Sequence, residues 1–176
     1  MTALGKGKTA AEAPKRRSRS RMAAVQALYQ MDLAGTDVAD VIDEFQKLRF
    51  NGVVIDAAGD NGNDLQGADA TFFADLLRGV VRSQRDIDPM VDQQLATGWR
   101  LVRIDSILRA ILRAGVFELR ERRDVPARVI ITEYINVAHA FFDADEPRVI
   151  NGVLDALARR VRPEEFDGTG KKSESK

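Results

Sequence analysis

The residues best suited to chemistry lie near the N-terminus, where a cluster of arginines precedes a tyrosine. The members of this group are Arg16, Arg17, Arg19, Arg21 and Tyr29. Guanidinium groups pair with phosphates and an aromatic ring stacks on an unpaired base, so these residue types suit single-stranded RNA. Arg17, Arg21, Val25 and Tyr29 are spaced by four, which would place them on one ridge of a continuous helix. The same spacing allows an alternative, in which Tyr29 packs in the core and the arginines are only solvated.

The charge distribution supports the first interpretation. The formal net charge is zero, but residues 1–22 carry seven Lys or Arg against one Glu, whereas residues 23–161 carry 16 basic and 22 acidic residues. A basic N-terminal segment on an acidic body suits a polyanion, because lysines and arginines release counterions when they bind phosphates. Composition alone leaves open that this segment is merely a solubilising tail.

No catalytic or metal-binding constellation is recognisable. His139 is the only histidine, and Asp143 follows it at helical spacing, but nothing places a nucleophile or an oxyanion site beside them. The acidic segment 56–69 fails as a calcium loop, because Leu65 and Thr71 stand where such a loop needs Gly and Glu. Without cysteine there are no disulfides or thiolate sites, which fits a reducing cytoplasm. We therefore expect neither an enzyme nor a cofactor.

The elements that position these residues are predicted to be helical throughout. Apolar residues keep helical spacing from residue 22 to 161, which predicts an all-α domain, a bundle of about seven helices. The expected helices cover approximately residues 18–33, 38–48, 72–81, 88–97, 104–122, 126–141 and 145–161. The β-branched run 129–131 is assigned to a helix rather than a strand, because its neighbours continue the helical spacing.

The remaining segments are expected to be tails, a loop and packing positions. The domain should span residues 15–163, with disordered tails at 1–14 and 164–176 and a long surface loop at 51–69. Gly115 and the pair Asn151-Gly152 lie within apolar helices, where small residues usually allow close helix packing. No apolar run approaches the roughly 18 residues that a membrane span needs.

Four short segments occur in a specific order and spacing. A basic lead-in precedes Ala-Val-Gln-Ala-Leu-Tyr at 24–29, and Leu-Arg-Ala-Gly-Val-Phe-Glu-Leu occupies 112–119. Asp-Val-Pro follows at 124–126 and Asn-Gly-Val-Leu-Asp at 151–155. Together they make residues 18–163 resemble the NusB family of bacterial transcription antitermination factors. Leu108 and Ala127 depart from the family pattern near positions associated with the protein partner.

The resemblance implies a function that the residues alone do not give. It implies binding of the boxA element of nascent ribosomal RNA together with NusE, a ribosomal protein, in a cytoplasmic complex that makes RNA polymerase resist termination. Arg17, Arg19, Arg21 and Tyr29 fall on the family's RNA-binding start, next to Arg16. Glu133 and Asp145 fall on acidic positions associated with the protein partner. Related proteins are monomers or dimers, so a homodimer is compatible with the resemblance.

Two other interpretations remain. The chain could be a helical protein-binding adaptor without intrinsic RNA affinity, and salt-dependent RNA binding would distinguish the two. It could also be related to the NusB-like domain of ribosomal RNA cytosine methyltransferases. That interpretation is disfavoured because the sequence has neither cysteine nor a Gly-rich cofactor-binding region.

Overall fold

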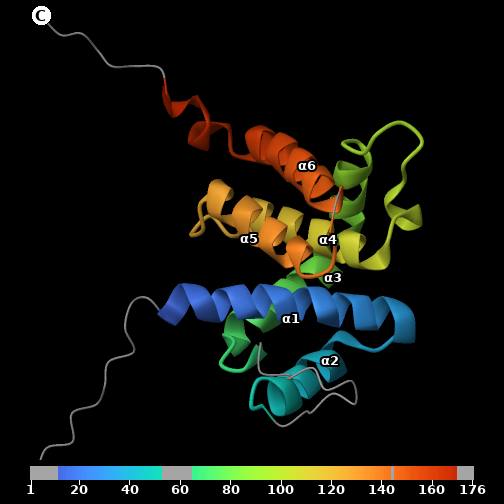
Figure 1. Ribbon diagram of the computed structural model, residues 1–176, viewed down its shortest axis with the longest axis vertical. Coiled ribbons are helices and arrows are strands. Elements are labelled where there is room, and N and C mark those ends of the chain that lie inside the picture. The colour runs from blue at the N-terminus through green and yellow to red at the C-terminus, as the bar shows by residue number, and fades with distance from the viewer. Residues whose placement is uncertain (1–11, 53–64, 144, 170–176) are drawn as a thin grey trace, which may run out of the picture.

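The computed structural model describes residues 12–52, 65–143 and 145–169, and every regular element in these ranges is helical (Figure 1). The α-helices are α1 (Glu12–Ala34), α2 (Val38–Glu44), α3 (Ala70–Asp92), α4 (Ser106–Glu121), α5 (Ala127–His139) and α6 (Glu146–Val161). A π-helical turn, η1 (Phe45–Arg49), continues α2, and three 3-10 turns are η3 (Leu101–Arg103), η4 (Pro163–Glu165) and η5 (Asp167–Thr169). The all-α prediction is confirmed. None of the described helices is long and apolar enough to cross a membrane.

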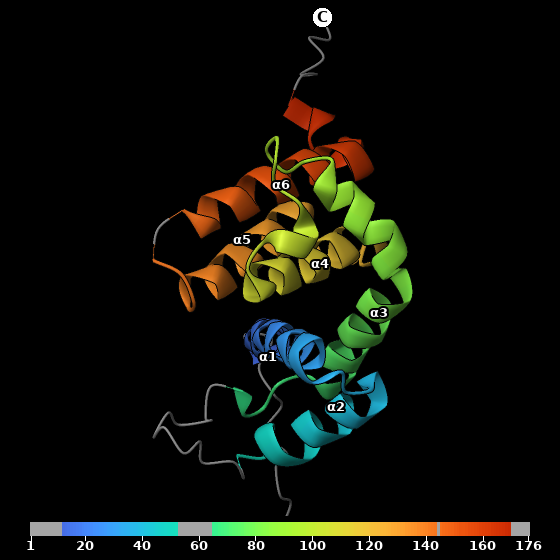
Figure 2. The same cartoon turned by 90° about the vertical axis from the view of Figure 1, so that its right-hand side faces the viewer.

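The helices form two groups that share α3. In Figure 1, α4, α5 and α6 pack together in the upper half, and α1 lies below them with α2 beneath it. The long helix α3 runs along one side of both groups, as Figure 2 shows. α1 contacts α3, α4 and α5, and its buried residues include Ala24, Val25 and Leu28. The N-terminal helix is therefore an integral part of the core.

α1 begins earlier than the sequence suggested. Ser18 and Ser20, expected as helix starts, lie within the helix, and their hydroxyl groups donate hydrogen bonds to backbone carbonyls. The Ser18 hydroxyl donates to Pro14 O at 3.1 Å, and that of Ser20 to Asp69 O at 2.8 Å. Serines inside a helix commonly bond to a carbonyl of the preceding turn, so the sequence preference for a cap was misleading. Residues 12–14 thus belong to α1, while residues 1–11 of the expected tail lie outside the described residues.

α3 also continues beyond its expected end. A separate helix at 88–97 was predicted, but α3 runs unbroken to Asp92 with Pro89 inside it. The proline lacks the N–H that would bond to the preceding turn, and Figure 2 shows the helix bending along its length. Asp69 caps the start of α3, accepting a hydrogen bond from Phe72 N at 3.0 Å. Of the expected 51–69 loop, residues 53–64 lie outside the described residues.

The C-terminal end of α4 is held by a buried arginine that no sequence pattern predicted. The guanidinium of Arg162 is fully buried and donates to four backbone carbonyls, those of Glu118, Leu119, Arg122 and Val125, at 2.6–2.9 Å. It also donates to the Glu165 carboxylate at 2.9 Å, and Glu165 accepts a hydrogen bond from Ala127 N at 2.7 Å. Residues 164–169, expected in a disordered tail, form η4 and η5 instead, because these contacts anchor their start.

Glycine positions show where helices approach most closely. A Cβ on Gly115 would lie 3.0 Å from Cδ1 of Leu154. The predicted close approach of another helix is therefore confirmed, and that helix is α6. Gly79 of α3 is tighter still, since a Cβ there would overlap the ring of Phe117. The expectation for Asn151-Gly152 was wrong, because both residues are exposed and nothing lies within 4 Å of a Cβ on Gly152.

Gly79 and Gly152 give a matched pair of substitutions. Gly79→Ala should lower the free energy of unfolding by about 1–3 kcal/mol, because Phe117 must move out of a packed interface. Gly152→Ala should raise it by roughly 0.5–1 kcal/mol, because alanine favours a helix and meets no neighbour. Urea unfolding followed by circular dichroism measures both values. Equal effects of the two substitutions would contradict the assigned packing.

Candidate functional site

The arginines of α1 fall into two groups, and Arg21 belongs to the interior. Its side chain is 3% exposed and forms a bidentate pair with Glu118 of α4, with Nε at 2.8 Å and Nη2 at 2.9 Å from the carboxylate oxygens. The hydroxyl of Tyr134 on α5 donates to Glu118 Oε2 at 2.6 Å. The predicted ridge of Arg17, Arg21 and Tyr29 is therefore wrong as a surface feature, since Arg21 is committed to α4.

The pKa values in this network follow from burial and from charge pairing. Burial alone would lower the pKa of Arg21, but its bonds to Glu118 outweigh that effect and raise it above the ordinary value. Burial and the charge of Glu118 together raise the pKa of Tyr134 well above its usual value. The phenol thus keeps its proton at neutral pH and remains a donor to Glu118.

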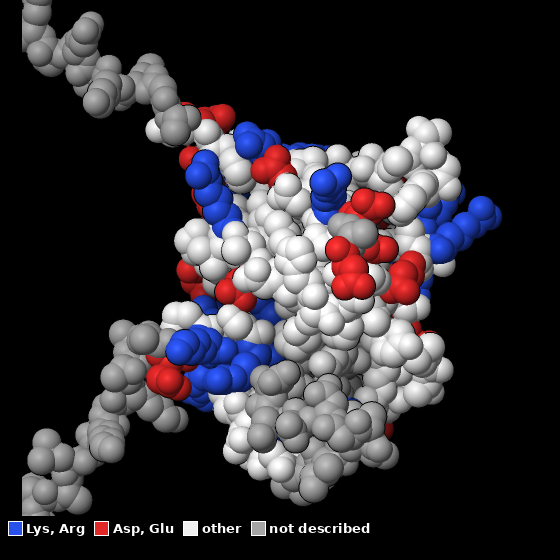
Figure 3. All heavy atoms as spheres, in the orientation of Figure 1, with Lys and Arg blue, Asp and Glu red and all other residues white. Residues whose placement is uncertain are grey.

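Arg16, Arg17 and Arg19 form the second group and remain partly exposed at the start of α1. Arg16 Nε donates to Gly67 O at 3.0 Å, which ties the helix to the segment before α3. Arg17 lies over the Phe72 ring at 4.7 Å and contacts Asp124 at 3.3 Å. We call Arg16, Arg17 and Arg19 the basic arm. Figure 3 shows basic side chains gathered at this end of α1.

Acidic residues limit the positive charge beside the basic arm. A groove of about 440 Å³ between the starts of α1 and α5 is lined by Arg17, Asp124 and Glu133, among others. The hydrogen bonds from Arg122 lower the pKa of Asp124, which therefore stays ionised at neutral pH. Glu133 lies 3.6 Å from Arg21 Nη1. The structure thus places Glu133 in a groove that Arg17 also lines, whereas Asp145 lines a different groove.

Tyr29 lies farther along α1, in a different groove. It is partly buried, and its groove of about 440 Å³ is also lined by Leu33, Phe45 and Arg49. Twelve residues of helix separate Tyr29 from Arg17, a distance of about 18 Å along the axis. The structure therefore does not bring the tyrosine and the basic arm into one compact site.

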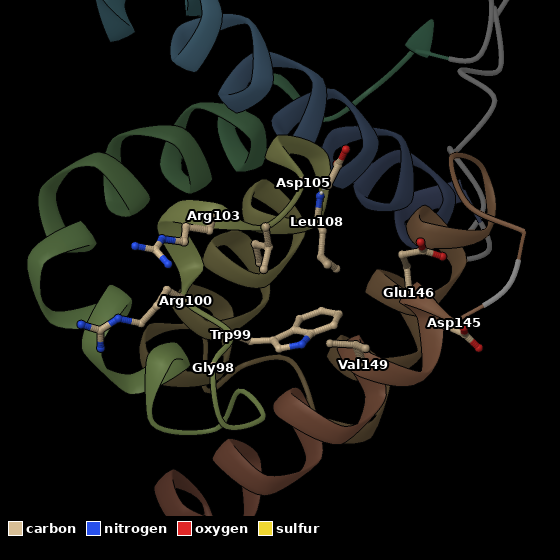
Figure 4. Close-up of a pocket in the computed structure, with 10 residues that line it drawn as sticks. Gly98, Trp99, Arg100, Arg103, Asp105, Leu108, Asp145, Glu146 and Val149 are labelled. Atoms are coloured by element: carbon tan, nitrogen blue, oxygen red, sulfur yellow. Dashed lines mark hydrogen bonds between the residues drawn. The ribbon is translucent and has the colours of Figure 1, made fainter.

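A second surface, which no sequence motif predicted, surrounds Trp99. The indole is 50% exposed and lines a largely apolar groove of about 370 Å³ together with Leu108 of α4 and Val149 of α6. Figure 4 shows the ring directed towards Val149, with Glu146 at the start of α6, Asp145 just before it, and Arg100 and Arg103 on the opposite side. We call this the Trp99 groove. A lone tryptophan before an apolar helix was the available sequence signal for this groove. The exposure of that tryptophan depends on the conformation of residues 98–105, which the signal does not give.

Asp145 borders the Trp99 groove and does not cap α6. The residue stands at the N-cap position, yet its side chain makes no capping hydrogen bond, and it is exposed. Figure 3 shows acidic side chains gathered near the start of α6. Asp145 and Glu146 therefore offer negative charge next to an apolar groove. Within the described residues, no group of three or more His, Asp or Glu side chains could hold a metal ion.

Comparison with known proteins identifies the family. The family model described as the NusB family matches residues 18–159. A transcription antitermination protein NusB from Rhodopseudomonas palustris strain TIE-1 is 49% identical over 156 residues, covering 86% of this chain and 83% of the relative. The chain belongs to the NusB family. This is a family of transcription antitermination factors and not of enzymes.

Solved NusB structures share the fold. Thermotoga maritima NusB superposes with a TM-score of 0.66 at 25% identity, covering 86% of this chain and 96% of the other. A NusB solved with NusE and double-stranded RNA superposes with a TM-score of 0.63 at 22% identity, covering 83% and 98% of the two chains. The helical arrangement described above is therefore that of NusB proteins.

The buried network predicts a ranking of substitutions. Glu118→Gln should lower the free energy of unfolding by about 3–5 kcal/mol, because it leaves the Arg21 charge buried without its partner. Tyr134→Phe removes only one hydrogen bond to that carboxylate and should cost about 1–3 kcal/mol. Denaturant unfolding measures both, and a larger decrease for Tyr134→Phe than for Glu118→Gln would contradict this order.

Proposed function

We propose that this chain is a transcription antitermination factor that holds single-stranded RNA on its basic arm and a basic protein partner in the Trp99 groove. The observation that carries the proposal is the division of the α1 arginines. Arg21 is fixed in the interior, whereas Arg16, Arg17 and Arg19 remain at the surface of a helix that is anchored in the core. Rigid positioning lowers the entropic cost of binding, which favours recognition of a flexible strand.

The RNA is proposed to be the boxA element of nascent ribosomal RNA, and the protein partner NusE. Family membership and the NusB solved together with NusE and RNA support this assignment. In this role the chain would join a cytoplasmic antitermination complex with RNA polymerase. Tyr29 is proposed as an additional stacking surface, in the groove that it shares with Arg49.

The Trp99 groove fits a basic protein because it combines an apolar anchor site with negative charge. A half-exposed tryptophan in a groove is a typical energetic centre of a protein interface. Asp145 and Glu146 at its edge would attract and orient a basic partner such as a ribosomal protein. Glu133, the other acidic residue assigned to the partner, lies in the groove beside the basic arm. We propose that it contacts the partner only where the partner extends towards the RNA.

Replacing Arg16, Arg17 and Arg19 together by alanine tests the RNA assignment. The slope of log affinity against log salt for a boxA-like single strand should fall by about 0.7 for each arginine–phosphate pair that the substitutions remove, up to roughly 2 in total. Arg21 is left in place, because removing it would disturb the core. An unchanged affinity and slope in the folded triple variant would favour the adaptor interpretation.

Substitutions in the Trp99 groove test the protein interface. Asp145→Asn should weaken the complex with NusE several-fold, most strongly at low salt, and Trp99→Ala should weaken it about tenfold or more. Titration calorimetry measures both affinities, and binding of RNA alone should not change. Asp155→Asn removes a carboxylate farther along α6 and serves as the control. If Asp145→Asn and Asp155→Asn bound NusE equally well, the acidic edge of the groove would have no role.

A further inference from the structure

The outer face of α3 carries three arginines that have no role in the proposed RNA and protein sites. Arg78, Arg82 and Arg85 are separated by four and three residues, so they share one face of the helix. All three are exposed, and none lies within ion-pair distance of a carboxylate in the part of the chain that the structure describes. We call Arg78, Arg82 and Arg85 the α3 stripe.

Neighbouring acidic residues are turned towards α4. Asp75 lies 3.5 Å from Arg122 Nη1, and Asp86 lies 3.9 Å from Arg120 Nη1. Each of these carboxylates therefore already faces an arginine from the end of α4. Neither carboxylate forms an ion pair with the α3 stripe, so the three arginines add positive charge to this surface.

The α3 stripe continues the surface of the basic arm. Arg17 and Arg122 both lie over the Phe72 ring, at 4.7 and 5.0 Å, in the first turn of α3. Arg122 Nη1 also lies 3.5 Å from Asp75, which lines a groove together with Arg78, one turn farther along α3. Figure 2 shows α2 beside the start of α3 and no helix on the outer side of its middle part. The basic arm and the α3 stripe thus lie on neighbouring parts of the surface, linked through Arg122.

We propose that the α3 stripe binds the sugar-phosphate backbone of the RNA strand held by the basic arm, which extends the contact along α3. The inference rests on the proposed RNA-binding function. Arg78 and Arg85 are about 10 Å apart along the axis, and a stacked strand carries a phosphate about every 3.4 Å. The stripe therefore spans about three phosphates. It contains no aromatic ring to stack on bases, so the contact is independent of base sequence.

The occupant is RNA rather than an acidic protein because of this continuity. From Phe72 to Arg85 the helix extends about 20 Å, the length of roughly six stacked nucleotides. Such a track gives a combined site within the roughly 4–16 nucleotides typical of single-strand binding folds. The inference therefore predicts a dependence on RNA length that a protein-binding surface would not produce.

The experiment compares two lengths of single-stranded RNA, of about 4 and about 12 nucleotides, of which only the longer can cover both the basic arm and the α3 stripe. The variant Arg78→Gln, Arg82→Gln and Arg85→Gln should leave binding of the short strand unchanged. For the long strand, its slope of log affinity against log salt should fall by up to about 2, at about 0.7 for each phosphate released. The corresponding triple lysine variant should retain most of the wild-type slope, because it keeps the charges.

Controls separate failure of this inference from failure of the proposed function. Replacing Arg148 and Arg159 of α6 by glutamine removes exposed arginines elsewhere and should not change the slope. If the wild-type chain bound neither strand, both the proposed function and the stripe inference would be overturned. Should it bind both strands while the glutamine variant kept the wild-type slope on the long strand, only the stripe inference fails. An equal decrease in slope per removed charge in the α6 control variant would also overturn the stripe inference, because it would show that the slope depends only on the total charge of the protein.

Discussion

The buried pairing of Arg21 with Glu118 is the constraint on which the rest of the structure depends. It joins α1 to α4, and the Tyr134 hydroxyl adds α5 to the same carboxylate. A charged group at 3% exposure is tolerated only when its partner and hydrogen bonds are in place. The three helices must therefore assemble together. Arg162 donates to the carbonyls of Leu119 and Arg122 at the end of α4. The segment that follows α6 therefore fixes the same helix end.

This constraint also explains the character of the basic arm. Because Arg21 anchors α1 in the core, the preceding turns extend from a fixed point, and Arg16 is further tied to Gly67. The arginines at the start of α1 are presented on an ordered helix rather than on a flexible tail. The proposed strand binding would therefore require less ordering of the protein, and contacts of these arginines with phosphates would fix the position of the strand rather than its base sequence. Acidic neighbours such as Asp124 reduce nonspecific attraction at the same place.

The sequence was sufficient for the all-α class and insufficient for several helix boundaries and for the partners of buried charges. Apolar periodicity located the core, and Gly115 correctly indicated close packing against Leu154. The four-residue spacing of Arg17, Arg21 and Tyr29 predicted one exposed ridge, but whether an arginine is buried depends on Glu118, which lies 97 residues away from Arg21. Asn151-Gly152 follows an apolar helical pattern, yet no helix faces it, because local spacing does not report which side of a helix is covered. The Trp99 groove was missed for the same reason.

α4 determines how the two proposed surfaces relate to each other. Its C-terminal end holds α1 through the pairing of Glu118 with Arg21, and its N-terminal end contributes Leu108 and the adjoining Asp105 to the Trp99 groove. Thirteen residues of helix separate Asp105 from Glu118, about 20 Å along the axis, so the Trp99 groove and the anchor of α1 lie at opposite ends of α4. A partner that also contacted the RNA would raise the effective concentration of each ligand for the other without any change of conformation. Under the proposed function, joint binding would arise from a rigid spacing between the sites, and the packed core supplies that rigidity.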